Sequence, residues 1–211
     1  MQILSLEHVD STQRYLLDAL KNGELEAPVA VTARVQSAGK GSRDNCWTGC
    51  EGNLFLSFAV PVKQLPADLP MESASIYLTY LLKEALAEFG SKVWLKWPND
   101  FYVGSQKIGG AITNLHSRNF VCGIGLNLKN APEGFGTLDI AIEQNLLLEN
   151  YFEKLKKSSS WKQIFSKYEL EFEKCRAFFT HDGNHKVLLK NAILLNDGSI
   201  ECNGQRIFSL R

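Results

Sequence analysis

Apolar and polar positions alternate with a period of two in several segments, and between these segments the period lengthens to that of an α-helix. Strands are expected at 3–8, 28–36, 53–60, 92–97, 101–103 and 120–128. Helices are expected at 10–22, 71–89, 142–156 and 161–175. From Phe178 onward the chain reads as short strands separated by turn signals such as Asn196-Asp197-Gly198. We therefore expect a main domain at 1–177 and a small β-barrel at 178–211.

The segment Lys96-Trp97-Pro98-Asn99-Asp100 interrupts one of these strands and leads into a hairpin. Pro98 has no N–H to give to a strand ladder, and the Asn and Asp after it favour a turn. Gly104-Ser105 then fits a two-residue hairpin loop. This loop predicts that Val103 lies opposite Gln106, Tyr102 opposite Lys107, and Asp100 opposite Gly109.

Side chains alternate along a strand, so this register predicts which side chains share a face. Asp100, Tyr102, Lys107 and Gly109 are expected on one face, with the first carbons of Asp100 and Lys107 roughly 7 to 8 Å apart. Gly109, Ala111 and Thr113 are small, which leaves room on that face for a ligand. A plain surface hairpin with solvated charges remains the alternative on this pattern alone.

The strand at 120–128 carries a second bare strip. Its apolar positions face the core, and they are Cys122, Ile124, Leu126 and Leu128. Its other face carries Gly123, Gly125 and Asn127. Two neighbouring strands with small or absent side chains on one face indicate the floor of a ligand-binding site more strongly than either strand does alone.

Two further polar segments have the chemistry of ligand binding. Asp10-Ser11-Thr12-Gln13 predicts a helix start with Asp10 as the cap, and a helix start offers unpaired N–H groups to a ligand. The loop from Gln36 to Trp47 contains glycines that permit close backbone approach, together with Lys40 and Arg43, which suit an anion. Its spacing matches neither the P-loop nor the dinucleotide fingerprint. Simple helix capping and a flexible surface loop are the respective alternatives.

Composition narrows the function classes. The 23 basic and 23 acidic residues balance, which argues against a broad nucleic-acid or membrane surface. No apolar stretch approaches the ~20 residues of a membrane span, so a cytoplasmic protein is expected. The five cysteines are odd in number and scattered, which indicates reduced thiols. The pairs Cys46/Cys50 and His181/His185 lack convincing partner pairs for a zinc site.

Taken together, these segments resemble one family, the biotin-protein ligases, which share a fold with lipoate-protein ligases and class II aminoacyl-tRNA synthetase cores. The likeness covers essentially the whole chain. The matching segments occur in the family's order, and they are 10–12, the glycine-rich loop, 96–100, Gln106-Lys107-Ile108-Gly109-Gly110 and Gly123-Ile124-Gly125-Leu126-Asn127. The resemblance implies an α+β fold, with a mixed sheet flanked by helices, and an SH3-like C-terminal β-barrel.

The resemblance also implies an activity, which is to join biotin to ATP as biotinyl-5'-adenylate and pass biotin to a lysine of a biotin carboxyl carrier protein. Catalysis would fall to Lys107, Asp100 and Lys96. Biotin binding would fall to Ser11, Thr12, Gln13, Gln36, Lys107, Gly123 and Gly125. Adenylate binding would fall to Gly39, Lys40, Gly41, Ser42, Arg43, Trp47, Asn127 and Arg211. Magnesium would arrive with ATP, and no protein metal site is implied.

The sequence departs from the family's pattern at two points. Family loops usually carry arginine where this chain has Ser42, so either Arg43 takes over its role or the adenylate is released more readily. The first strand begins by residue 3, so we expect no DNA-binding domain and no binding of nucleic acid. From the composition we also expect no binding to a membrane. The sequence does not decide whether the protein forms a homodimer. A lipoate or octanoate ligase and a non-catalytic sensor of biotin or nucleotide are the alternative functions.

Overall fold

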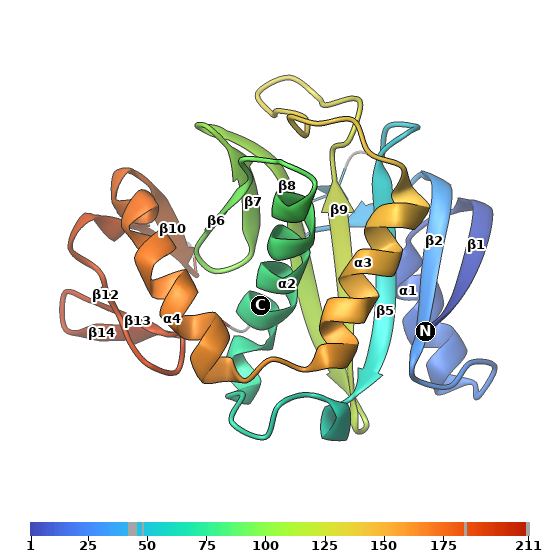
Figure 1. Ribbon diagram of the computed structural model, residues 1–211, viewed down its shortest axis with the longest axis horizontal. Coiled ribbons are helices and arrows are strands. Elements are labelled where there is room, and N and C mark those ends of the chain that lie inside the picture. Colours follow the sequence, from blue (N-terminus) through green and yellow to red (C-terminus); the bar gives the residue numbers. More distant parts are fainter. Residues whose placement is uncertain (42–45, 48, 184, 210–211) are drawn as a thin grey trace.

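A seven-stranded mixed sheet forms the centre of the computed structural model, which describes residues 1–41, 46–47, 49–183 and 185–209 (Figure 1). The strand order is β1-β2-β5-β9-β8-β7-β6. β1 and β2 run parallel, and the other neighbouring pairs run antiparallel. The strands are β1 (Gln2–Val9), β2 (Val29–Gln36), β5 (Leu54–Pro61), β6 (Trp94–Lys96), β7 (Asp100–Val103), β8 (Gln106–His116) and β9 (Asn119–Leu126). The predicted mixed sheet is confirmed.

Helices cover the two faces of this sheet unequally, with α2 and α3 against one face and α1 behind the other (Figure 1). The α-helices are α1 (Thr12–Lys21), α2 (Ala74–Glu88), α3 (Gln144–Lys157) and α4 (Trp161–Phe172). Short 3-10 turns are η2 (Val62–Gln64), η3 (Met71–Ser73), η4 (Glu173–Ala177) and η5 (Leu189–Asn191). The predicted helices at 71–89 and 161–175 are therefore shorter, because each has a 3-10 turn at one end. No helix within the described part of the chain is long and apolar enough to span a bilayer.

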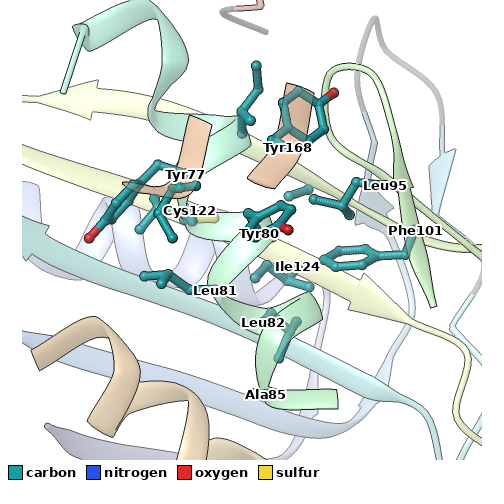
Figure 2. Close-up of a cluster of buried hydrophobic side chains, with 14 of the residues drawn as sticks. Tyr77, Tyr80, Leu81, Leu82, Ala85, Leu95, Phe101, Cys122, Ile124 and Tyr168 are labelled. Atoms are coloured by element: carbon teal, nitrogen blue, oxygen red, sulfur yellow. The ribbon is translucent and has the colours of Figure 1, made fainter. Parts of the chain in front are cut away.

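The core is divided by the sheet. The larger part packs under α2 and α4, where Tyr80 and Tyr168 meet edge to face near Leu95, Phe101 and Ile124 (Figure 2). The smaller part joins Leu16 of α1 to apolar side chains of β2, β5 and β9. α1 packs chiefly on β2, β5 and β9, and it reaches β8 through the side-chain amide of Gln13, which bonds Asn114.

The start of α1 differs from its prediction by one residue. Ser11, not Asp10, is the N-cap, and its side chain accepts a hydrogen bond from the N–H of Arg14. The Asp10 carboxylate instead forms an ion pair with Arg14 on the surface. With the cap at Ser11, Thr12 and Gln13 fall in the first turn and are both buried against the sheet.

The segment 96–100 forms a tight connection between β6 and β7, and the strand before it is shorter than predicted, at Trp94–Lys96. The Trp97–Pro98 peptide bond is cis. Asn99 forms two hydrogen bonds that hold the turn against β8. Its backbone carbonyl accepts from the N–H of Ala111 at 3.1 Å, and its side-chain amide donates to the Ala111 carbonyl at 2.5 Å. This double contact sets how β7 lies against β8.

The predicted register of the hairpin is correct near the loop and wrong further along. Tyr102 pairs with Lys107, as expected, but Asp100 pairs with Gly110 and not with Gly109. The register shifts because β8 contains a bulge, with Ile108 as its extra residue. The bulge turns Gly109, Ala111 and Thr113 away from the face on which we expected them, and it places Gly110 beside Asp100 and Lys107.

The C-terminal segment consists of short strands, as predicted, arranged in two small sheets. One is the hairpin β10 (Phe179–Asp182) and β11 (His185–Leu188). The other is the meander β12 (Ile193–Leu194), β13 (Ile200–Cys202) and β14 (Gln205–Ile207). Its apolar side chains belong to the same large core as those of α2 and α4, so the segment packs against the rest of the chain.

Trp97 ties this segment to the turn at 96–100, and its indole N–H donates to the Gly198 carbonyl at 2.8 Å. Trp97 is fully buried. Replacing it with phenylalanine leaves that carbonyl unpaired, so we expect the free energy of unfolding in urea to fall by about 2 kcal/mol. Trp47→Phe is the matched control, because the Trp47 indole N–H has no partner among the described residues. Equal losses in both variants would contradict this role for Trp97.

Candidate active site

A cavity opens on the face of the sheet that carries α1, beside the N-terminus of that helix. Its lining includes eleven residues that the sequence singled out, namely Ser11, Thr12, Gln13, Gln36, Lys40, Gly41, Trp47, Asp100, Lys107, Gly123 and Gly125. Segments far apart in the sequence therefore meet at one place, as the predicted binding floor requires.

The floor of the cavity is made of bare backbone on β8 and β9. Gly110 lies directly opposite Gly125 across the two strands. A side chain at Gly110 would begin 3.2 Å from an Asp100 carboxylate oxygen, and one at Gly125 would begin 2.5 Å from the Trp47 indole. Gly123 and Gly125 line the cavity as predicted for β9. On β8 the predicted strip of small residues is wrong, because the bulge puts Gly110 and then the larger Ile112 opposite these two glycines.

An acidic group held between two lysines stands at the β7 end of the cavity. Asp100 accepts from Lys107 Nζ at 2.6 Å through one carboxylate oxygen and from Lys96 Nζ at 3.1 Å through the other. Its side chain is one-fifth exposed. Burial by itself would raise the pKa of Asp100, but the charges and hydrogen bonds of Lys107 and Lys96 outweigh burial and hold that pKa below its ordinary value. Asp100 is therefore ionised at neutral pH.

The glycine-rich loop approaches the floor through two short paired strands, β3 (Gly39–Lys40) and β4 (Cys46–Trp47). Gly39 has no room for a side chain, since one would begin 2.3 Å from the Gln36 amide nitrogen. Trp47 lies over Gly125, and the cavity that remains has a volume of about 50 Å³, enough for a few water molecules. A ligand that lies on Gly125 must therefore displace Trp47 from the floor.

Several predicted residues do not line the cavity. Asn127 is buried, and its side-chain amide donates to the Gly136 carbonyl at 3.1 Å. Lys96 acts through Asp100, and Gly39 packs behind Gln36. Ser42, Arg43 and Arg211 lie outside the described residues, so their assignments stay predictions.

Other lining residues were missed by the sequence reasoning. They are Leu56, Ser57, Gly110, Ile112 and Ile124, whereas Ala111, which was expected beside a ligand, is also in the lining. Gly110 belongs to the matching segment 106–110, and Ser57 is a polar residue in the otherwise apolar strand at 54–61. The polarity of Ser57 indicates a buried hydrogen bond but does not indicate what the bond serves.

The cavity does not fit a metal ion held by the protein. Within the described ranges, no group of three or more histidine, cysteine, aspartate or glutamate side chains is placed to hold a metal ion. Asp100 is the carboxylate in the cavity lining, and both its oxygens already bond lysines. The described residues therefore do not form a site for a protein-bound magnesium ion.

Comparison with solved structures shows close likeness over the full chain. Biotin acetyl coenzyme A carboxylase synthetase from Helicobacter pylori, solved with bound biotinylated ATP, is 42% identical, with a TM-score of 0.94 over 98% of this chain and 99% of that one. Biotin protein ligase from Aquifex aeolicus, solved with biotin and ATP, is 26% identical, with a TM-score of 0.74 over 100% and 98% of the two chains.

Comparison with the sequences of known proteins indicates the same family as the solved structures do. The bifunctional ligase/repressor BirA of Salmonella typhimurium is 32% identical over 165 residues, which are 70% of this chain and 50% of that protein. The chain thus spans about half the length of the curated relatives it matches first. The profile of the Biotin/lipoate A/B protein ligase family matches residues 5–129, which include the whole of the cavity lining. The predicted family is confirmed, and this chain belongs to the biotin/lipoate A/B protein ligase family.

Proposed function

We propose that this protein activates biotin with ATP as biotinyl-5'-adenylate and then transfers biotin to a lysine of a biotin carboxyl carrier protein. The observation that carries the proposal is the pairing of Lys107 with Asp100 at 2.6 Å, at the edge of a cavity with a bare floor. Family membership and the ligands named for the two solved relatives support the same activity.

The first step brings a carboxylate against a phosphate. A biotin carboxylate oxygen attacks the α-phosphorus of ATP, a mixed anhydride forms, and pyrophosphate leaves. Each pair of like charges at 4 Å costs roughly 4 kcal/mol at an effective dielectric near 20. Lys107 projects into the cavity where it can bind both anions, and Lys40 lies in the same lining. These cations offset the repulsion. Magnesium belongs to the proposal as an ion carried on the phosphates of ATP.

The second step needs a neutral amine. The carrier lysine first loses one ammonium proton to solvent and then attacks the biotinyl carbonyl carbon. The bond to the phosphate oxygen breaks, AMP leaves, and a second proton passes from the new amide nitrogen to solvent. Removing the proton from a free lysine at pH 7 costs about 4.6 kcal/mol. Since its lysine partners lower the pKa of Asp100, this carboxylate is a weak base. We therefore assign Asp100 the role of orienting the incoming amine, with no covalent enzyme intermediate.

The test of this function is exchange of labelled pyrophosphate into ATP, measured with biotin and with lipoate side by side. We expect exchange that depends on biotin and is at background level with lipoate. Exchange that depends on lipoate would favour the alternative ligase, and no exchange with either acid would favour a non-catalytic sensor.

Gly125 supplies a second test. Valine suits a strand, so Gly125→Val is expected to fold, but its side chain would fill the space that Trp47 now covers. We expect the dissociation constant of biotin, measured by calorimetry, to rise at least about tenfold. Asn119→Val, on the same strand outside the cavity, is the matched control. An unchanged affinity in a folded Gly125→Val protein would show that biotin does not lie over this glycine.

The remaining assignments belong to the same proposal. The carrier protein is the expected macromolecular partner, and the Biotin--[acetyl-CoA-carboxylase] ligase of Mycobacterium tuberculosis, 28% identical over 131 residues, supports it by its name. The cytoplasm is the proposed location. Absence of operator binding stays a prediction, and a sequence-specific shift of promoter DNA in a gel at physiological salt would contradict it.

A further inference from the structure

The backbone carbonyls of Lys107 and Ile108 lie beyond the end of the β8–β9 ladder, because β9 ends at Leu126. A bulge disrupts the ladder locally, so such groups need other partners. The Ile108 carbonyl accepts from the N–H of Asn127 at 2.7 Å, and the Lys107 carbonyl accepts from the N–H of Gly136 at 2.9 Å. The backbone of Lys107 is therefore held by a residue of a separate loop.

The loop that contains Gly136 is itself held by Asn127 and Asn53. The Asn127 carbonyl accepts from the N–H of Leu138 at 2.8 Å, and its side-chain amide donates to the Gly136 carbonyl at 3.1 Å. Asn53 donates to the side-chain oxygen of Asn127 at 3.4 Å, and its own oxygen accepts from the backbone N–H groups of residues 128–130. Both asparagines are buried and lie outside the cavity lining. A series of hydrogen bonds thus leads from Asn53 through the loop to the carbonyl of Lys107.

Gly136 has no room for a side chain. A Cβ atom there would begin 2.8 Å from the Cβ atom of Gln106, 3.0 Å from the Gln106 side-chain oxygen and 3.3 Å from Ile108 Cγ2. Carbon atoms that are not bonded to each other pack at about 3.5 to 4.0 Å, so a methyl group would push this loop away from β8. The hydrogen bond to the Lys107 carbonyl would then lengthen.

We propose that Gly136 is a positioning residue, which aims Lys107 into the cavity by holding its backbone carbonyl. The inference rests on the proposed function, because it assigns a support to the lysine that offsets the charge repulsion in the first step. Lys107 must keep its ammonium group at 2.6 Å from Asp100 and still meet both anions. A misplacement of about 1 Å at a reacting group can cost about 10²-fold in rate.

The test is single-turnover formation of the adenylate by Gly136→Ala, which we expect to be about tenfold slower than in wild type. Adding Gln106→Gly to this variant removes the two atoms at 2.8 Å and 3.0 Å from the new methyl group. Gln106 is exposed and does not line the cavity. The double variant should therefore recover to within about threefold of the wild-type rate.

Gly134→Ala is the matched control within the same loop. Gly134 has a φ of +83°, and the space where its side chain would begin is open. Alanine there strains the backbone without touching β8, so the rate should stay within about twofold of wild type. A wild-type rate in folded Gly136→Ala, equal slowing in Gly134→Ala, or no recovery in the double variant would each overturn the inference.

Asn53→Asp weakens the same series of hydrogen bonds without adding bulk, and it replaces Gly136→Ala in the test if that variant does not fold. Aspartate keeps an oxygen that accepts from residues 128–130 but cannot donate to Asn127. We expect adenylate formation to slow about threefold, as for the loss of one hydrogen bond. A wild-type rate in folded Asn53→Asp would then overturn the inference.

The ion pair between Lys107 and Asp100 gives a readout that needs no turnover. A double-mutant cycle of Lys107→Met and Asp100→Asn, measured by urea unfolding, gives the coupling between the two side chains. In the Gly136→Ala background this coupling should fall to about half of its wild-type value or less. An unchanged coupling would overturn the inference, whereas absence of biotin-dependent exchange in wild type would count against the proposed function alone.

Discussion

Replacing Lys107 with methionine is expected to slow biotin-dependent adenylate formation by about 10²-fold to 10³-fold, as for the loss of one preorganised charge at a reacting centre. Methionine keeps much of the length of the side chain and removes its cation. The carboxylate and the phosphate would then meet without the charge that stands 2.6 Å from Asp100 in the cavity wall. Single-turnover formation of the adenylate, followed by quenching and chromatography, measures the effect directly.

Two comparisons isolate the cause. Lys92→Met removes an exposed lysine outside the cavity and should leave the rate unchanged. Lys107→Arg keeps the charge and should retain more activity than Lys107→Met, although its larger head group fits the ion pair with Asp100 less well. A Lys107→Met enzyme with a wild-type single-turnover rate would remove Lys107 from the mechanism.

The second large effect is expected for Asp100→Asn, which leaves Lys96 and Lys107 side by side without their shared anion. Breaking a largely buried ion pair by removing one partner costs about 3 kcal/mol, so we expect the free energy of unfolding at pH 7 to fall by that amount. We also expect transfer from preformed adenylate to the carrier lysine to slow about 10²-fold, because the amine loses the group that orients it. Adenylate formation, which relies on Lys107, should slow less.

The pH dependence of this loss follows from the direction of the pKa shift. The folded pKa of Asp100 lies below its ordinary value of 3.8. Its stabilising contribution is therefore fully present above that value and is lost as the pH falls through the folded pKa. Wild type and Asp100→Asn should differ in urea unfolding at pH 7 and converge in strong acid. Asp139→Asn, a carboxylate with a lowered pKa outside the cavity, should leave transfer unchanged.

Much of this site was predictable because strand periodicity decides which side chains share a face. The alternation of Gly123 and Gly125 with buried apolar residues needs no tertiary information, and the hairpin loop needs only its two residues. The exact register of β7 on β8, in contrast, could not be predicted without tertiary information. The bulge at Ile108 accompanies contacts between Asn99 and Ala111, and such long-range backbone contacts leave no periodic signature in the sequence.

Ser57 and Asn127 show the two other limits of sequence reasoning. Ser57 lies in an apolar run that predicts a buried strand, and only its neighbours on α1 and β2 reveal the hydrogen bonds that its hydroxyl joins. Asn127 follows the glycine strip and was assigned to the adenylate. In the structure its amide supports the loop that contains Gly136. Alternation correctly predicted the face that carries Gly123 and Gly125, but it did not predict that the cavity ends before Asn127.

A crystal structure of the protein with biotin would show directly whether the ligand lies on the glycine floor beside Lys107. We expect the fused rings over Gly123 and Gly125, with Trp47 displaced, and the carboxylate within hydrogen-bond distance of Lys107 Nζ. Biotin bound elsewhere, or bound here with its carboxylate turned away from Lys107, would contradict this expectation.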